Sequence, residues 1–318
     1  MSEGTLRVGV VQLAPVLLDR PATIAKVVGG LAEAAAAGCG LAVLGETLVP
    51  GYPAWLCRLD GARFEAPELK ELHALYLEQA VCLEEGDLDP VLAAARRHRL
   101  AVVIGVAERP LDRGGHSLYC SRVFVDAAGE VVSVHRKLMP TYEERLAWAV
   151  GDGAGLTVHR VGPFAVGALN CWENWMPLAR AALYGLGEDL HLAIWPGARR
   201  LTAEITRFIA LESRSFVVSA SGLLRPADVP AGFPLRDRFL AGAGEYLYDG
   251  GSAVAGPDGA WLVEPVVGEE RLIVVELDRR RVLEARQSFD PAGHYARPDV
   301  LRLEVDRRRQ RAVETRDG

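Results

Sequence analysis

Three side chains of catalytic type follow segments whose composition predicts buried strands. A short apolar run leads into Glu46, the segment Val131–Arg136 leads into Lys137, and Phe164–Asn170 leads into Cys171. Sites in α/β folds assemble at the carboxyl ends of strands, because a rigid sheet fixes the first residue beyond each strand. A carboxylate, an ammonium and a thiol would then converge. This set suits covalent catalysis by the thiol, with the carboxylate as its base.

Each of these residues, taken alone, also has an ordinary structural interpretation. Glu46 would be a solvated residue at a strand end, Lys137 a surface cation, and Cys171 a small buried side chain. Lysine is scarce, however, because Lys26, Lys70 and Lys137 are the only lysines among 36 cationic residues. A lysine at position 137 therefore indicates a need for a compact, tunable ammonium rather than a guanidinium.

Other catalytic motifs are absent from the sequence. It contains no Gly-x-Ser-x-Gly, His-Glu-x-x-His or phosphate-loop signature, and its 7 His show no helical metal-binding spacing. The 5 cysteines include no Cys-x-x-Cys pair, so neither a zinc site nor a disulfide framework is predicted. A cysteine–histidine dyad remains an alternative, because its partners need not be close in sequence.

The elements that would position these residues alternate between strands and helices. Strands are predicted over residues 6–13, 41–45, 101–107, 117–126, 130–137, 164–170, 191–195, 216–221, 251–256, 260–264 and 271–278. Helices are predicted over residues 21–38, 67–83, 89–99, 176–186, 202–213 and 279–287. No linker or repeat divides the chain, so we expect one α/β domain with sheets packed face to face and covered by helices.

Composition and charge narrow the function classes. The chain has 318 residues, of which 50% are hydrophobic and 25% charged, as in ordinary globular proteins. Its net charge of −6 disfavours nucleic-acid binding but leaves small neutral or cationic substrates open. The sequence shows no signal segment and no apolar run of about 18 residues. We therefore expect a soluble, cytoplasmic protein that does not enter a membrane.

Longer motifs around the three residues resemble one enzyme superfamily. The Glu, Lys and Cys motifs of the carbon–nitrogen hydrolase (nitrilase) superfamily are similar to Leu44-Gly45-Glu46-Thr47, His135-Arg136-Lys137-Leu138-Met139-Pro140-Thr141-Tyr142-Glu143-Glu144-Arg145 and Asn170-Cys171-Trp172-Glu173-Asn174-Trp175-Met176-Pro177-Leu178. Two further segments resemble the nitrilase branch in particular, namely Gly151-Asp152-Gly153 and Gly293-His294-Tyr295-Ala296-Arg297-Pro298-Asp299. The resemblance runs from about Leu6 to about Val305.

This resemblance implies a fold and a site. The fold is a four-layer α-β-β-α sandwich, with residues 1–318 as one domain, a core over about 6–305 and a short Arg-rich tail over 306–318. The site consists of Cys171, Glu46 and Lys137 with a second glutamate, best matched by Glu144 and alternatively by Glu143. No metal and no organic cofactor are implied. Family members form homodimers or larger homo-oligomers, and the tail is either solvated or engaged in salt bridges between subunits.

The implied reaction is hydrolysis of a small organic nitrile to a carboxylic acid and ammonia. It would pass through a thioimidate and then an acyl-thioester on Cys171. One alternative is an amidase or carbamoylase that uses the same Cys-Glu-Lys site. A second alternative, from another class, is a catalytically inactive assembly or binding protein that retains the fold.

Aromatic residues near the motifs are candidates for the wall of a substrate pocket. The candidates are Tyr52, Trp55, Trp172, Trp175 and Trp195. Packing beneath the neighbouring loops and helix is an alternative for the first four. Trp195-Pro196-Gly197 resembles the aryl or arylaliphatic type of nitrilase, and the sequence leaves the identity of the nitrile open.

Overall fold

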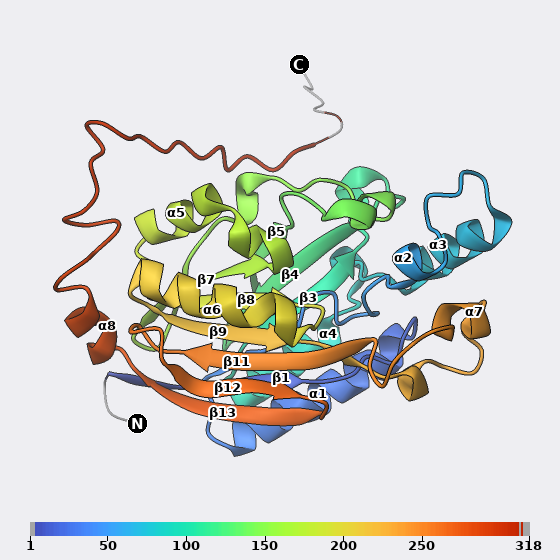
Figure 1. Ribbon diagram of the computed structural model, residues 1–318, viewed down its shortest axis with the longest axis horizontal. Coiled ribbons are helices and arrows are strands. Elements are labelled where there is room, and N and C mark those ends of the chain that lie inside the picture. Colours follow the sequence, from blue (N-terminus) through green and yellow to red (C-terminus); the bar gives the residue numbers. More distant parts are fainter. Residues whose placement is uncertain (1–3, 312, 314–318) are drawn as a thin grey trace.

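Two mixed β-sheets pack face to face in the computed structural model, which describes residues 4–311 and 313 (Figure 1). The first sheet has the strand order β13-β1-β2-β3-β4-β5, and the second has the order β10-β11-β9-β8-β7-β6, with β12 paired to β11. The strands are β1 (Thr5–Gln12), β2 (Leu41–Val43), β3 (Ala101–Glu108), β4 (Tyr119–Val125), β5 (Val131–Arg136), β6 (His159–Val161), β7 (Phe164–Asn170), β8 (Leu190–Trp195), β9 (Phe216–Ser221), β10 (Leu223–Leu224), β11 (Tyr248–Ala255), β12 (Trp261–Val267) and β13 (Arg271–Asp278).

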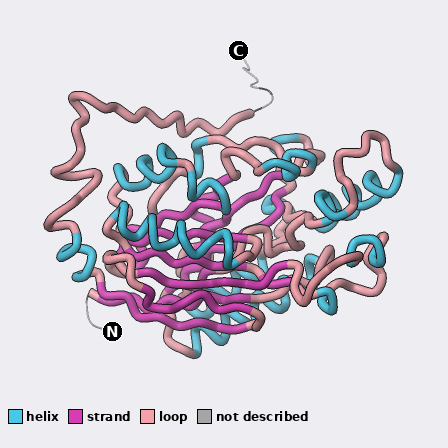
Figure 2. The backbone as a smooth tube through the Cα atoms, viewed as in Figure 1, coloured by secondary structure: helices cyan, strands magenta, loops and turns pink. Residues whose placement is uncertain are grey.

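Helices cover the outer face of each sheet (Figure 2). The α-helices are α1 (Arg20–Ala36), α2 (Trp55–Arg58), α3 (Pro67–Gln79), α4 (Asp89–His98), α5 (Pro177–Gly185), α6 (Arg199–Ser213), α7 (Arg236–Leu240) and α8 (Arg280–Ala285). The first sheet is covered by α1 and α4, and the second by α5 and α6. Short 3₁₀-helices, among them η3 (Tyr142–Leu146), η4 (Gly153–Gly155) and η5 (Cys171–Trp175), occupy the connecting loops.

Alternation along the strands separates the two faces of each sheet. Val8 and Val10 of β1 belong to the core between the sheets, together with Val166 and Leu192 of the second sheet. Val11 belongs instead to the cluster beneath α1 and α4, because successive strand residues point to opposite faces. The arrangement is therefore helix, sheet, sheet, helix, and the predicted α-β-β-α sandwich is confirmed.

Strand direction brings the ends of β2, β5 and β7 to one edge of the sandwich. Strand β2 is parallel to β3, and β3 is related to β5 by two antiparallel pairings through β4. Strand β7 is parallel to β8, which is parallel to β9. Each of these three strands is followed directly, or within a few residues, by one of the predicted catalytic residues.

The predicted elements agree best with the observed ones where the apolar pattern is strongest. The bounds of β7, β9 and β13 coincide with the predicted ranges 164–170, 216–221 and 271–278. The short elements α2, α7, β6 and β10 were not predicted, because elements of two to five residues carry too little periodicity. Helix α6 begins at Arg199, three residues before the predicted start at residue 202.

The end of the chain runs in extended form outside the four layers, in dark red in Figure 1. Arg309 forms an ion pair with Asp152 at 3.1 Å and donates a hydrogen bond to the Val134 carbonyl at 2.7 Å. Arg308 pairs only with the neighbouring Asp306 among the described residues. The described part of the predicted Arg-rich tail is thus attached to its own chain, while residues 312 and 314–318 lie outside the described residues.

None of the helices in the described part of the chain is both long enough and apolar enough to cross a membrane.

Candidate active site

Glu46 follows β2 and lies in a tight turn. Its backbone N–H donates to the Trp195 carbonyl at 3.0 Å, which anchors the turn on the second sheet. Thr47 has φ +46°, a left-handed conformation that redirects the chain sharply. Gly105 of β3 lies against the turn, and a Cβ at this position would stand 2.5 Å from the Glu46 Cα. The carboxylate can therefore occupy its position only because residue 105 has no side chain.

Lys137 follows β5 and is completely buried. Its backbone N–H donates to the Cys120 carbonyl at 2.8 Å, and its own carbonyl accepts from the Gly151 N–H at 2.9 Å. The Lys137 Nζ bonds to Glu46 Oε1 at 3.1 Å and to Glu144 Oε2 at 2.7 Å. The ammonium is thus held between two carboxylates and cannot reach bulk water.

Cys171 is the first residue of η5 and has φ +49°. A non-glycine residue in this left-handed region stores about 1–3 kcal/mol of strain, which the surrounding structure must hold in place. The Asn174 side chain donates to the Cys171 carbonyl at 2.8 Å. Glu173 lies 3.1 Å from His135 Nε2 and accepts from the Leu138 N–H at 2.5 Å. The cysteine turn is therefore tied to the loop that carries the lysine.

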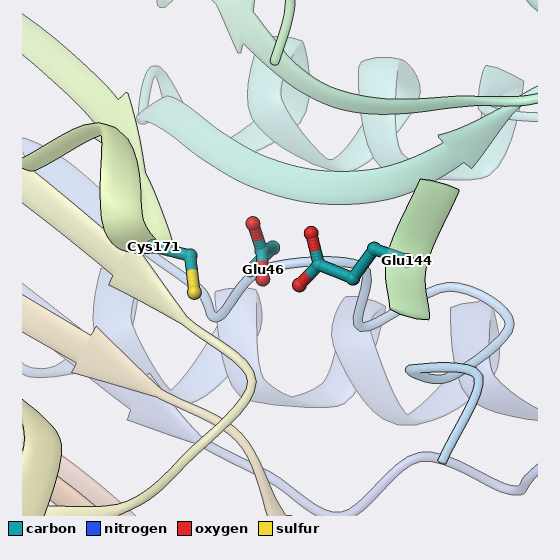
Figure 3. Close-up of side chains that lie close together, drawn as sticks. All are labelled: Glu46, Glu144 and Cys171. Atoms are coloured by element: carbon teal, nitrogen blue, oxygen red, sulfur yellow. The ribbon is translucent and has the colours of Figure 1, made fainter. Parts of the chain in front are cut away.

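The reactive atoms meet in one place. One carboxylate oxygen of Glu46, one of Glu144 and the Cys171 sulfur all lie within 4.8 Å of one another. Figure 3 shows the three side chains pointing toward a common centre from separate segments of the chain. Such ligand types also suit a metal ion. Because the Lys137 ammonium already bonds to both carboxylates, positive charge at this centre is supplied by the protein itself.

Of the two adjacent glutamates that the sequence left open, Glu144 is the one that contacts Lys137. Glu144 is buried in η3, and its Oε2 also accepts from the Thr141 N–H at 2.6 Å. Its Oε1 accepts from the Tyr52 hydroxyl at 2.8 Å. Glu143 is half-buried and lines the cavity above the site instead.

Burial and charge set the protonation of these groups. Burial raises the pKa of the Glu46 carboxyl to about 7, with the Lys137 ammonium opposing this rise and Glu144 adding to it. Burial, and then the charge of Glu46, raise the pKa of the Cys171 thiol well above its usual range. Burial by itself lowers the pKa of Lys137, but the surrounding negative groups raise it well above its usual range. The thiol is therefore neutral at rest, and the ammonium stays charged.

A second buried thiol lies at the site and was not singled out in the sequence. Cys120 of β4 donates to Glu46 Oε1 at 3.2 Å and lies 3.4 Å from Thr47 Oγ1. Burial, followed by the charge of Glu46, raises the pKa of the Cys120 thiol well above its usual range, so it acts as a neutral donor. In the sequence, the only sign of this thiol is a cysteine in the predicted strand that precedes the one leading into Lys137. No recognisable motif surrounds it.

Behind the cysteine turn lies a chain of buried polar side chains. His191 of β8 lies 2.9 Å from Glu188 through Nδ1 and 2.8 Å from the Asn174 side-chain oxygen through Nε2. Asn174 in turn holds the Cys171 carbonyl. These contacts could not be predicted from the sequence, because the residues come from η5, β8 and the loop between α5 and β8.

A cavity of about 200 Å³ opens over Cys171. Three of the aromatic candidates line it, namely Tyr52, Trp172 and Trp195. Tyr248 also lines the cavity. Its ring meets the Tyr52 ring edge to face, with the two centroids 5.5 Å apart. The remaining lining residues are Thr141, Glu143, Glu144, Pro196, Gly197, Ala198, Leu201 and Thr202.

Two other aromatic candidates lie outside this cavity. Trp55 is buried at the start of α2, where its ring meets Tyr76 edge to face with centroids 4.9 Å apart. Trp175 lies at the end of η5 beside Trp172, and 43% of its surface is exposed. Closeness to a motif in sequence does not decide which way a ring points, because the helical turn directs each side chain separately.

Known proteins with a similar sequence match this chain over almost its whole length. Residues 7–287 match the family model described as carbon-nitrogen hydrolase. An aliphatic nitrilase of Rhodococcus rhodochrous is 35% identical over 99% of this chain and 83% of its own. An aliphatic nitrilase of Sinorhizobium fredii (strain HH103) is 37% identical over 98% of both chains. A bifunctional nitrilase/nitrile hydratase of Nicotiana tabacum is 36% identical over 96% of this chain and 87% of its own.

Solved structures share the fold at lower sequence identity. A carbon-nitrogen hydrolase from Helicobacter pylori G27 superimposes with a TM-score of 0.70 at 20% identity, over 93% of this chain and 96% of that one. An amidase from Nesterenkonia sp. gives a TM-score of 0.65 at 20% identity, over 91% of this chain and 96% of that one. The resemblance that the sequence motifs predicted is thus confirmed, and the chain belongs to the carbon-nitrogen hydrolase family, with nitrilases among its relatives.

Proposed function

We propose that the protein is a nitrilase, which converts an organic nitrile and two waters into a carboxylic acid and ammonia through a covalent intermediate on Cys171. The observation that carries the proposal is the buried set of one thiol, one ammonium and two carboxylates beneath a small cavity. The relatives at 35–37% identity that carry nitrilase names support the same reaction.

The first half of the reaction needs a base, because the Cys171 thiol is neutral at rest. Glu46 takes the thiol proton, and the sulfur forms a bond to the nitrile carbon while one carbon–nitrogen π bond breaks. The nitrogen then receives the proton, which gives a neutral thioimidate. Lys137 stabilises the negative charge that develops on the nitrogen, and a preorganised donor of this kind typically lowers a barrier by about 3–4 kcal/mol.

The second half uses the same groups on water. Glu46 takes a proton from a water whose oxygen attacks the thioimidate carbon, and the nitrogen leaves as ammonia after it receives protons. A second water attacks the resulting thioester, which releases the carboxylic acid and restores the thiol. Departure of sulfur instead of nitrogen from the first tetrahedral species would release an amide, so the acid-to-amide ratio reports this branch.

The two carboxylates have different surroundings, which supports different roles. Both oxygens of Glu144 are engaged, one by Tyr52 and the other by Lys137 and Thr141. Glu46 Oε2 has no hydrogen-bond partner among the described residues. Glu46 is therefore the better base, and Glu144 holds the Lys137 ammonium in position.

A substrate panel tests the proposal. Aliphatic, aryl and arylacetonitriles are incubated with the purified protein, with the corresponding amides in parallel, and ammonia, acid and amide are quantified. We expect acid and ammonia from at least one nitrile class. Amide hydrolysis without any nitrile turnover would overturn the proposal in favour of an amidase or carbamoylase that uses the same residues.

Variants test the covalent step. Cys171→Ala removes the nucleophile, and Lys137→Arg replaces a point donor with a wider planar group, so both should abolish turnover. Intact-protein mass spectrometry should detect an adduct in the parent protein during turnover and none in Cys171→Ala. Cys57→Ala is the matched control, because Cys57 is exposed and does not line the cavity. Turnover that survives in Cys171→Ala would exclude the covalent mechanism.

We further propose that the protein acts in a reducing cytoplasm as a homodimer or a larger homo-oligomer. All five cysteines are free thiols, which fits a reducing compartment. Trp172 and Trp175 lie beside each other on η5 and expose apolar surface, as does Leu178 of α5, which fits an interface. Light scattering coupled to size-exclusion chromatography would contradict the oligomer if it gave the mass of a single chain.

A further inference from the structure

The cavity above Cys171 carries negative side chains without a cationic lining residue. Glu143 and Glu144 both line it, and no lysine or arginine does so among the described residues. Lys137 lies deeper, where its ammonium is bonded by Glu46 and Glu144. A substrate that enters this cavity therefore meets carboxylate charge before it meets any positive group.

Glu143 is the carboxylate at the solvent side of this cavity. It is half-buried, whereas Glu144 and Cys171 are buried. The Glu143 carboxylate has no hydrogen bond and no ion pair in the part of the chain that the structure describes. Its neighbours include Tyr248 and Cys57, since its charge contributes to the rise in the pKa of both groups. Neither of these two residues supplies a positive charge to the Glu143 carboxylate.

The position of the reacting atom fixes the orientation of a substrate. A nitrile carbon must reach the Cys171 sulfur at the bottom of the cavity, so the other end of a small substrate points toward the solvent side, where Glu143 lies. A charge on that end interacts with a carboxylate in a partly desolvated site, which strengthens the interaction relative to water. An ammonium or hydroxyl group is favoured there, and a carboxylate is repelled.

We propose that Glu143 selects substrates by charge, so that nitriles with a distal ammonium or hydroxyl donor are preferred and nitriles with a distal carboxylate are rejected. This inference rests on the proposed nitrilase function and specifies its substrate class.

The test compares three end groups on straight-chain nitriles of closely similar length. Pentanenitrile, 4-aminobutanenitrile and 3-cyanopropanoate supply a neutral, a cationic and an anionic end, and the same end groups are placed on an aryl skeleton if the parent protein prefers it. The kcat/KM of each is measured for the parent, Glu143→Gln and Glu143→Lys. Glu71→Gln is the matched control, because Glu71 is an exposed residue of α3 outside the cavity.

We expect the parent protein to prefer the cation over the anion. Because Glu143 acts with opposite signs on the two charged substrates, its removal in Glu143→Gln should reduce the cation-to-anion ratio of kcat/KM about tenfold, with each interaction contributing a few-fold. Glu143→Lys should invert the preference, and Glu71→Gln should leave the ratio unchanged. Raising the salt concentration to about 1 M should also compress the ratio in the parent.

The outcomes separate this inference from the proposed function. The parent protein could hydrolyse the neutral nitrile while the cation-to-anion ratio of kcat/KM stays the same in Glu143→Gln and Glu143→Lys. This result would overturn the role of Glu143 and leave the nitrilase proposal standing. Absence of turnover of every nitrile by the parent protein would overturn the nitrilase proposal itself.

Discussion

At the scale of single residues, the site separates one available carboxylate from one that is fully engaged. Glu46 has an oxygen without a partner and a pKa raised to about 7 by burial, whereas Glu144 is held by three donors. A base is most effective when its pKa lies close to the working pH. The desolvation that makes Glu46 costly to bury therefore also makes it a suitable base.

The pH dependence of the reaction follows from this pKa. Only ionised Glu46 accepts the Cys171 proton, so kcat/KM should rise with pH through about 7, and activity should be lost as Glu46 becomes protonated below that value. The kcat/KM profile reports the free enzyme and is therefore the profile to measure. Glu71→Gln should have the same profile as the parent. A profile that stays flat from about pH 5 to 8 would contradict the assignment of Glu46 as the base, since an ordinary carboxyl titrates near 4.3.

The buried chain from Glu188 through His191 to Asn174 should position the nucleophile. Asn174 holds the carbonyl of Cys171, whose left-handed backbone is strained. His191→Leu removes the contact to Asn174, and a displaced nucleophile should lower kcat by about tenfold or more, because small misplacements are costly. KM should change much less, since His191 does not line the cavity.

A matched control and a conservative variant keep this test sharp. His116→Leu changes an exposed histidine and should leave kcat unchanged. His191→Gln keeps one polar group that can bond to Asn174 and should recover part of the loss. Equal kcat values in His191→Leu and the parent would show that the chain of polar residues has no positioning role.

At the scale of elements, sharp turns at strand ends place the reactive groups. Thr47, Tyr142 and Cys171 all have φ between +45° and +49°, and each lies within two residues of a catalytic side chain or is one. Such conformations cost about 1–3 kcal/mol each, so they persist only where packing and hydrogen bonds hold them. The sheets therefore support the strained turns on which the chemistry depends.

Gly105 provides a test of this support. In Gly105→Ala the new Cβ would approach the backbone of Glu46 to 2.5 Å, and backbone atoms cannot move aside as a side chain can. We expect destabilisation of about 1–3 kcal/mol and a larger relative loss of activity, because the base is displaced. Stability is measured by urea unfolding and activity by kcat/KM.

The control for this prediction is Gly29→Ala. Gly29 lies within α1, and a Cβ there meets no atom within 4 Å. This substitution should leave activity unchanged and should stabilise the protein by about 0.5–1 kcal/mol, because alanine favours the helix. Full activity in Gly105→Ala would show that the turn at Glu46 tolerates displacement.

Elements with strong patterns could be predicted from the sequence, and the residues after them could be found as a consequence. Strand β7 has no polar side chain before its last residue, Asn170, so the placement of Cys171 could be inferred. The orientation of Trp55 could not, because α2 is a single turn whose direction depends on packing against Tyr76 and Phe233. The contact of His191 with Asn174 also depended on tertiary structure, since the two residues come from different elements.

At the scale of the whole molecule, the order of the strands joins both ends of the chain. Strand β1 pairs with β13 over eight residue pairs, while β6 to β12 between them form the second sheet. The first sheet cannot form fully from one half of the sequence, because it needs β13 from the other half. We therefore propose that residues 1–318 fold as one domain, and two separate denaturant transitions, one for each sheet, would contradict this.

The tail beyond the sandwich is attached through Arg309 and the neighbouring Gln310, and this attachment gives the last prediction. Asp152 accepts from Arg309 at 3.1 Å and from the Gln310 N–H at 2.9 Å, and it is 6% exposed. Arg309→Ala leaves the Asp152 carboxylate without its cation, so the tail should detach more often, and hydrogen exchange across residues 301–311 should become faster. Arg308→Ala is the matched control, because the exposed Arg308 pairs only with Asp306 among the described residues, and exchange should then stay close to that of the parent. Equal exchange rates in the two variants would mean that the contacts of Arg309 with Asp152 and Val134 do not hold the tail.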